Sequence, residues 1–296
     1  MSGKPPARHA TWGLIALFCV LWSSAFSAAK IALRDCPALT LLTVRFLLAG
    51  VLMLAWAAAT QTLPRLRVRE ILQLGMLGVL NSGLYLGLSW SGMTTVSSTF
   101  AAILISTNPL LIGLLAGPIL GERMNARKLA GLCLGLAGVA IVLRSRLFYP
   151  SAGAHEDLRG TLLVAGGLLS LVAGTLAFKR LKPGAPIWTA TGVQSVAAGV
   201  AVLPFAWHNE SLADLHVTHS LLWSMTYSIV AVSIGGYALW FTILSRSSAT
   251  SASALHFLMP PLGLFFGWLV LDEMVSWADM LGIVPIALGI WLVTRG

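Results

Sequence analysis

The sequence predicts an all-α membrane protein in which ten transmembrane helices form two inverted five-helix repeats around a central cavity. Hydrophobic residues make up 57% of the 296 positions and charged residues only 10%, whereas soluble domains carry about 25% charged residues. Apolar runs of about 20 residues, long enough to cross the hydrocarbon core, recur along the chain. Residues 97–144 also align without a gap on residues 248–295, with 12 of 48 positions identical. Composition and run length predict the membrane class, and the internal alignment predicts the repeats.

Ten apolar runs are the expected membrane spans. They cover residues 12–33, 38–60, 70–91, 96–120, 127–144, 160–180, 187–207, 219–244, 249–271 and 276–294. Of the 19 Lys and Arg residues, 13 fall in segments on the side of the N-terminus and 4 in the loops on the other side. Cytoplasmic loops are the ones enriched in Lys and Arg. We therefore expect both termini in the cytoplasm, and a bacterial inner (plasma) membrane as the location.

Each half of the chain holds five spans. Because five is an odd number, the second half enters the membrane from the opposite side, which makes the repeats inverted. We expect residues 1–147 to form the first repeat, residues 148–159 an outer linker, and residues 160–296 the second repeat.

The basic charge predicts no nucleic-acid partner. The formal net charge is +9, but the basic residues lie in short loops between apolar spans. Three cysteines give no disulfide framework, and His216 and His219 have no companion ligands for a metal. We expect a lipid bilayer and a small-molecule substrate as partners, no cofactor and no metal, and either a monomer or a homodimer.

Three prolines interrupt two of the spans near their middle. Pro109 occupies the position equivalent to Pro260, and Pro261 follows. A proline inside a helix frees a backbone carbonyl, and lipid cannot satisfy it. These three positions are therefore expected hinges that face protein or a water-filled cavity, and a packing kink covered by a neighbouring helix is the alternative. Matched interruptions in two halves are typical of a transporter's central site.

Polar and aromatic residues in several spans are the candidate substrate contacts. Aromatic walls with a few polar groups suit a small amphipathic solute, although Trp and Tyr also gather at membrane interfaces. The candidates are Trp22, Ser24, Asn81, Tyr85, Asn108, Tyr237, Trp240 and His256.

The charges within or beside the spans are expected to be structural. Lys30 lies near the outer end of its span, and Arg45 lies deeper, where binding of a substrate carboxylate is the alternative role. Glu122 and Glu273 lie at span ends, where a carboxylate favours the N-terminus of the following helix. Because no carboxylate lies at mid-span, a carboxylate proton relay is not expected. His256 is the one mid-span residue whose type suits proton coupling.

Several motifs together resemble the EamA branch of the drug/metabolite transporter superfamily. They are Trp22-Ser23-Ser24-Ala25-Phe26 leading to Lys30, Arg45-Phe46, Pro109, Gly121-Glu122-Arg123, and the spaced glycines Gly131 and Gly138. The second half departs from the pattern, with Asp272-Glu273-Met274 in place of Gly-Glu-Arg and no Trp-Gly-Ser run. The resemblance implies ten helices, inverted repeats, a central cavity and efflux of metabolites. Overall, the chain looks most like the bacterial exporters of aromatic and other amino acids.

These observations predict a metabolite exporter and no enzyme. The expected substrates are amino acids, including aromatic ones, moved by alternating access, with downhill transport favoured over proton antiport. A multidrug or nucleotide-sugar carrier of the same superfamily is the first alternative. An integral-membrane enzyme is the second, and it would need a cluster of His, Asp or Glu with suitable spacing, which the sequence lacks.

Overall fold

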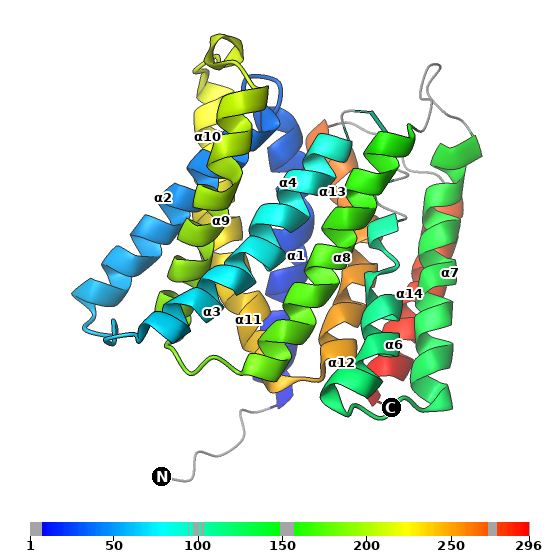
Figure 1. The fold of residues 1–296 in the computed structure, drawn as a ribbon. Helices are drawn as coiled ribbons and strands as arrows, with labels where there is room; N and C mark the ends of the chain where they lie inside the picture. Colours follow the sequence, from blue (N-terminus) through cyan, green and yellow to red (C-terminus); the bar gives the residue numbers. More distant parts are fainter. Residues whose placement is uncertain are drawn as a thin grey trace.

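The computed structural model describes residues 8–93, 95–96, 101, 104–148, 157–271 and 277–295, and within them every regular element is helical (Figure 1). The first half contains α1 (Arg8–Ala32), α2 (Ala38–Ala59), α3 (Val68–Gly78), the π-helix η1 (Val79–Leu84), α4 (Tyr85–Gly92), α6 (Asn108–Leu120) and α7 (Ala126–Phe148). The second half contains α8 (Leu158–Leu181), α9 (Ile187–Asn209), the 3-10 turn η2 (Leu212–Asp214), α10 (His219–Tyr227), the π-helix η3 (Ser228–Gly236), α11 (Tyr237–Arg246), α12 (Ala249–Ser253), the 3-10 segment η4 (Ala254–Leu258), α13 (Met259–Leu271) and α14 (Trp277–Arg295).

Six helical segments of the described chain are long and apolar enough to cross a membrane. They are Gly13–Ala32, Ala38–Ala59, Val68–Gly92, Leu158–Leu181, Ile187–Asn209 and His219–Arg246, and each coincides with a predicted span. The other four predicted spans contain α6, α7, α12 to α13, and α14, which are also helical. The expectation of a multi-pass helical membrane protein is therefore confirmed.

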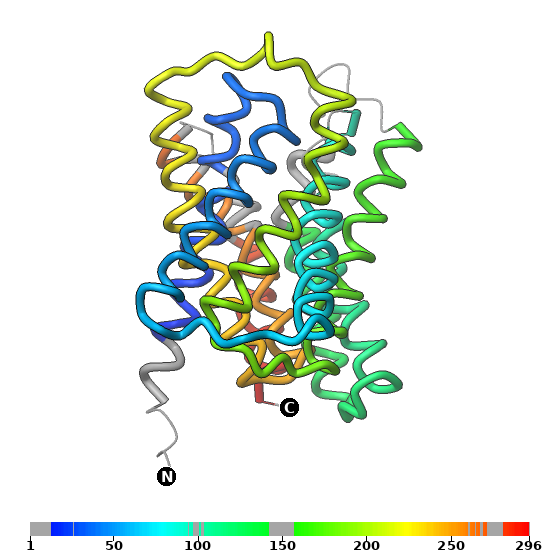
Figure 2. The backbone as a smooth tube through the Cα atoms, turned by 60° about the vertical axis from the view of Figure 1, so that its left-hand side comes forward, coloured from blue at the N-terminus to red at the C-terminus, as the bar shows by residue number. Residues whose placement is uncertain are grey.

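The start of the first described helix and the end of the last lie on the same side of the bundle. Figure 1 shows the start of α1 and the end of α14 at its lower edge, where the α2–α3, α6–α7 and α8–α9 connections also lie. Figure 2 agrees, and it shows the connection between α9 and α10 crossing the opposite end. The segments that carry most of the basic residues thus share one end of the molecule, as the sequence predicts.

Two spans contain a π-helical segment that ends directly before a tyrosine. η1 separates α3 from α4 and precedes Tyr85, and η3 separates α10 from α11 and precedes Tyr237. A π segment widens the helical turn and often marks a functional position. It also changes the direction of the side chains that follow, so a regular helical repeat does not predict the faces on which Tyr85 and Tyr237 lie.

The prolines start new helices instead of bending continuous ones. α6 begins at Asn108 and α13 at Met259, one residue before Pro109 and Pro260 respectively. Proline is favoured in the first turn of a helix, where its missing N–H leaves no bond unmade. Both spans are thus interrupted at the expected positions, and the role of these prolines as hinges stays a prediction. Pro109 and Pro261 are buried against protein, whereas the side chain of Pro260 lies outside the described residues.

Glycines allow α7 and α14 to pack with their backbones in close contact. A Cβ atom on Gly131 would lie 2.7 Å from the carbonyl oxygen of Gly289, and one on Gly289 would lie 2.6 Å from that of Gly131. Small residues permit such approaches between membrane helices. The spaced glycines of the fifth span therefore serve packing within the chain.

Replacing Gly131 with alanine is expected to lower the stability of the protein. Alanine favours a helix over glycine by about 1 kcal/mol, but overpacking against a backbone costs about 1–3 kcal/mol. The matched control is Gly13→Ala, because a Cβ atom there meets nothing within 4 Å. Thermal unfolding in detergent should show a lower midpoint for Gly131→Ala and an unchanged or higher one for Gly13→Ala. Equal midpoints would contradict the close α7–α14 contact.

Candidate functional site

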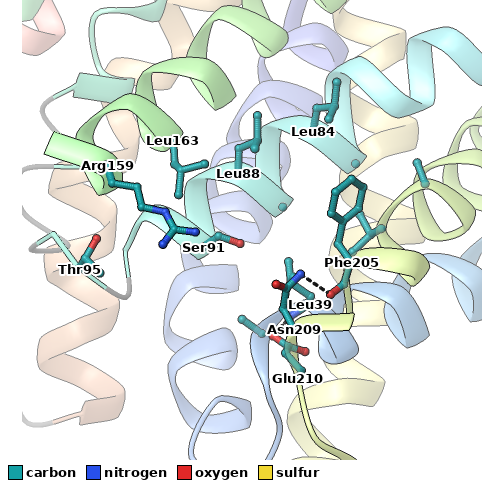
Figure 3. Close-up of a pocket in the computed structure, with 15 residues that line it drawn as sticks. Leu39, Leu84, Leu88, Ser91, Thr95, Arg159, Leu163, Phe205, Asn209 and Glu210 are labelled. Carbon is teal, nitrogen blue, oxygen red and sulfur yellow. Dashed lines mark hydrogen bonds between the residues drawn. The ribbon is translucent and has the colours of Figure 1, made fainter. Parts of the chain in front are cut away.

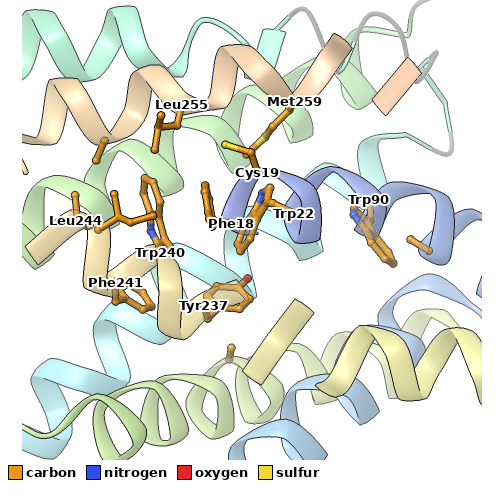
Figure 4. Close-up of a cluster of buried hydrophobic side chains, with 14 of the residues drawn as sticks. Phe18, Cys19, Trp22, Trp90, Tyr237, Trp240, Phe241, Leu244, Leu255 and Met259 are labelled. Carbon is orange, nitrogen blue, oxygen red and sulfur yellow. The ribbon is translucent and has the colours of Figure 1, made fainter. Parts of the chain in front are cut away.

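A continuous chain of aromatic rings joins α1 to α11 and η4. The ring centroids of Trp22 and Tyr237 are 4.9 Å apart, and those of Phe18 and Trp240 are 5.5 Å apart. Trp240 also meets His256 edge-on at 4.9 Å. Figure 4 shows Phe18 and Trp22 on α1 facing Tyr237 and Trp240 on α11. The structure thus brings together four of the predicted substrate contacts, and we call Phe18, Trp22, Tyr237, Trp240 and His256 the ring chain.

The ring chain is buried and closely packed. Each of its members is less than 10% exposed, and centroid separations near 5 Å correspond to direct contact between rings. A solute cannot lie between Trp22 and Tyr237 unless α1 and α11 move apart. The described arrangement is therefore a closed one at this point.

Sequence reasoning missed Phe18 and the flanking Phe241, which stacks on Tyr237 at 6.2 Å. A signal was present, because Phe18 precedes Trp22 by four residues and Phe241 follows Tyr237 by four. Residues four apart share a helix face.

Polar groups from three helices meet beside Tyr237. The Arg45 Nε donates to Ser233 Oγ at 2.8 Å, and both residues are buried. The buried Tyr237 hydroxyl faces Ser82 without a well-formed hydrogen bond. Tyr85 lies within electrostatic reach of Tyr237 and is 2% exposed. The two tyrosines that follow the π segments therefore belong to one buried region.

Two asparagines carry buried amide atoms that lack partners in the described part of the chain. Asn81 donates to the Leu77 carbonyl at 3.1 Å, but its Oδ1 accepts no bond. Neither amide atom of Asn108 is bonded, and this side chain is fully buried. An unsatisfied buried polar group costs about 1–3 kcal/mol. Such groups are available to a solute or to water.

Ser24 and Lys30 make no described contact with the ring chain. Ser24 shares a hydrogen bond of 2.5 Å with the Tyr227 hydroxyl and donates to the Leu21 carbonyl. Lys30 is exposed near the end of α1. His256 Nδ1 is hydrogen-bonded to the Ser253 carbonyl at 3.1 Å, and its ring is nearly perpendicular to that of Trp240.

Glu122 binds a helix N-terminus in the other half of the chain. Its carboxylate accepts from the Ala249 N–H at 2.6 Å and from the Thr250 hydroxyl at 2.8 Å, at the start of α12. We expected the N-terminus of the following helix, but a helix N-terminus attracts a carboxylate from any neighbouring element. Lys179 beside it donates to the Leu244 and Ser247 carbonyls. Glu273 lies outside the described residues.

Glu210 makes an equivalent contact that sequence reasoning missed. Its carboxylate accepts from the Leu39 N–H at 2.8 Å, the Thr40 N–H at 2.7 Å and the Thr40 hydroxyl at 2.8 Å, at the start of α2. The start of α2 and the start of α12 lie at opposite ends of the bundle (Figure 1). One carboxylate thus ties the two halves together at each end.

Replacing Glu122 with alanine is expected to loosen the bundle where α6 meets α12. Hydrogen bonds to a charged group contribute about 1.5–3 kcal/mol each, and the partial exposure of Glu122 reduces this contribution. We therefore expect the equilibrium constant for opening of the bundle to rise by about tenfold. Opening of the bundle can be measured as the rate at which maleimide labels Cys19, which is buried beside Trp22. The other two cysteines are removed by Cys36→Ser and Cys133→Ser, so that Cys19 alone is labelled. Glu70→Ala is the control, because the Glu70 carboxylate accepts from the Arg67 N–H at the start of its own helix. An unchanged Cys19 rate would contradict the role of Glu122.

A separate cavity of 590 Å³ lies between α2, α4, α8 and α9 (Figure 3). Its walls are mainly apolar, with Leu84, Leu163 and Phe205 among them, and Ser91, Arg159 and Asn209 are among its polar lining residues. None of the predicted substrate contacts lines it. Among the residues that the structure describes, no group of three His, Cys, Asp or Glu side chains could hold a metal ion.

The helical architecture defines a multi-pass membrane protein, and comparison with known proteins gives its family. The chain belongs to the EamA-like transporter family, whose profile matches twice, at residues 10–144 and 158–295. It is therefore a membrane transporter.

Relatives and a solved structure are similar over nearly the whole chain. "Uncharacterized transporter YvbV" of Bacillus subtilis is 26% identical, covering 99% of this chain and 93% of its own length. A protein of Salmonella typhimurium named "Probable amino-acid metabolite efflux pump" is 25% identical, covering 94% of this chain and 93% of its own. One crystal structure has a TM-score of 0.80 at 19% identity, covering 97% of this chain and 98% of that one, and supports the fold alone.

Proposed function

We propose that this transporter exports amino acids, including aromatic ones, across the bacterial inner membrane by alternating access. The observation that carries the proposal is the ring chain, which places four aromatic side chains and a histidine beside buried polar groups. An aromatic amino acid offers the matching surfaces, because its ring stacks while its charged groups need polar partners. The names of two relatives, as probable amino-acid metabolite efflux pumps of Salmonella typhimurium and Escherichia coli, support the same substrate class.

The halves of the chain are proposed to be inverted repeats. Support comes from the recurrence of elements at the 151-residue offset: α6 and α13 are each 13 residues long and carry proline in their second position. α3 and α10 also begin 151 residues apart, at Val68 and His219. The family profile matches once in each half.

Alternating access requires the bundle to open at one end while the other stays closed. In our proposal Glu122 holds one end and Glu210 the other, and the ring chain parts between them. The end that carries most of the basic residues is the cytoplasmic one. Since none of the described carboxylates belongs to the buried polar region beside Tyr237, downhill transport is preferred over proton antiport.

Proteoliposome efflux tests the substrate class and the coupling. Vesicles loaded with labelled amino acids, nucleosides, a nucleotide sugar or a cationic dye should release only the amino acids, with phenylalanine and tryptophan among them, and without an imposed pH gradient. Vesicles holding a Trp240→Ala variant serve as the control for specific efflux. Release of the dye or the nucleotide sugar alone would support the alternative carriers and overturn the proposal.

A further inference from the structure

Arg45 is a buried cation whose described partners are all neutral. It is 4% exposed in α2, its Nε donates to Ser233 Oγ at 2.8 Å, and its guanidinium carbon lies 5.7 Å from the centroid of the Phe46 ring. Tyr237 is the other group within electrostatic reach. A buried guanidinium that lacks a counter-ion is strongly destabilising. An apolar side chain of similar size would fill the same space with a smaller loss of solvation free energy.

Four acidic groups of the described chain are engaged elsewhere. Glu122 and Glu210 bind helix N-termini at opposite ends of the bundle. Asp35 accepts from the Thr218 hydroxyl, and Asp157 caps the start of α8. None of them is hydrogen-bonded to Arg45. These four side chains therefore do not neutralise the charge of Arg45.

A second observation points to a ligand at the same place. Tyr237 is 3% exposed, and its buried hydroxyl lies beside Ser82 without a hydrogen bond of regular geometry. Its ring contacts Trp22 at 4.9 Å. Tyr237 thus lies beside both the buried polar groups and the ring chain. A ligand with an anionic group on a short stem from an aromatic ring would satisfy both.

We infer that Arg45 and Tyr237 form a carboxylate subsite, so that the transported solute must carry a free carboxylate next to its aromatic group. The guanidinium provides charge-assisted, paired donors for the two carboxylate oxygens, and the tyrosine hydroxyl provides a third donor. Ser233 Oγ accepts a bond from the Nε of Arg45, and in this proposal the outer nitrogens of the guanidinium bind the carboxylate. This inference rests on the proposed function, and it narrows the substrate to carboxylates, excluding the corresponding amines and amides.

Competition against labelled phenylalanine efflux in wild-type proteoliposomes tests this without any substitution. We expect 3-phenylpropionate, which keeps the carboxylate and lacks the amine, to compete. Phenylalaninamide and phenethylamine, which lack the carboxylate, should compete about tenfold more weakly or not at all. Equal competition by phenylalaninamide and phenylalanine would overturn the subsite.

Variants test the residues themselves. Arg45→Gln should raise the KM for phenylalanine by about tenfold or more and remove the discrimination against phenylalaninamide, and Ser233→Ala should cause a smaller rise. Arg65→Gln, in an exposed loop, is the matched control and should change neither. An unaltered KM and an unaltered preference in Arg45→Gln would overturn the inference, and if that variant fails to fold, the wild-type competition decides. A wild-type protein that moves no amino acid would refute the proposed function, whereas one that moves amino acids and amides alike would refute only the subsite.

Discussion

Replacing Gly78 with alanine is expected to separate α3 from α9 and to abolish transport. A Cβ atom at Gly78 would lie 2.0 Å from the Gln194 carbonyl oxygen and 2.5 Å from its Cα. Both are backbone atoms inside a helix, so neither can rotate away. Overpacking costs about 1–3 kcal/mol where side chains can adjust, and here we expect the upper end or more. Asn81 follows three residues later, so the displacement also reaches the buried polar region.

The control for this substitution lies one turn earlier in the same helix. A Cβ atom at Gly75 would lie 3.7 Å from the Ala197 side chain, which is ordinary contact. Gly75→Ala should therefore keep or raise the unfolding midpoint, since alanine favours the helix. Size-exclusion profiles and thermal unfolding in detergent measure both variants. A Gly78→Ala protein as stable as Gly75→Ala would contradict the close packing of α3 on α9.

Truncating Trp240 to alanine is expected to slow the efflux of aromatic amino acids by at least about tenfold. The Trp240 side chain contacts both Phe18 and His256. Losing an aromatic contact of about 1.5 kcal/mol corresponds to a change of about tenfold. Because the neighbouring rings should also collapse into the space left by Trp240, we expect the transport rate to fall by at least this factor. Trp240→Phe retains a ring and should keep part of the activity. Initial rates from phenylalanine-loaded vesicles measure the effect.

Trp90→Ala separates the loss of substrate contact from simple loss of packing. Trp90 is 8% exposed and belongs to the same hydrophobic core, but it lies away from the ring chain (Figure 4). Both truncations should lower stability by about 3–5 kcal/mol. If Trp90→Ala lost efflux as completely as Trp240→Ala at matched stability, the ring chain would have no specific role in transport.

The membrane class was predictable because it depends on composition and run length, which need no tertiary information. The six apolar spans follow from those two properties. The interruptions beside Pro109 and Pro260 were predictable, since proline limits a helix locally. Whether a proline bends a helix or begins one depends on the residues packed around it.

The remaining features depend on contacts between distant segments. The π segments before Tyr85 and Tyr237 have no local signature in the sequence, because a widened turn is stabilised by its neighbours. Glu210 resembles any loop carboxylate until α9 places it against the start of α2. The neutral surroundings of Arg45 likewise become visible only when α2 and η3 are side by side. For the same reason the sequence left its role open between structure and carboxylate binding.

The position of a bound substrate tests the central claim most directly. Crystals of the protein with 4-iodophenylalanine would locate the iodine by its anomalous scattering. The account predicts one peak among Trp22, Tyr237 and Trp240, with the rings moved apart and the carboxylate directed to Arg45. A peak in the cavity beside Leu163 and Phe205, with the ring chain still closed, would contradict it.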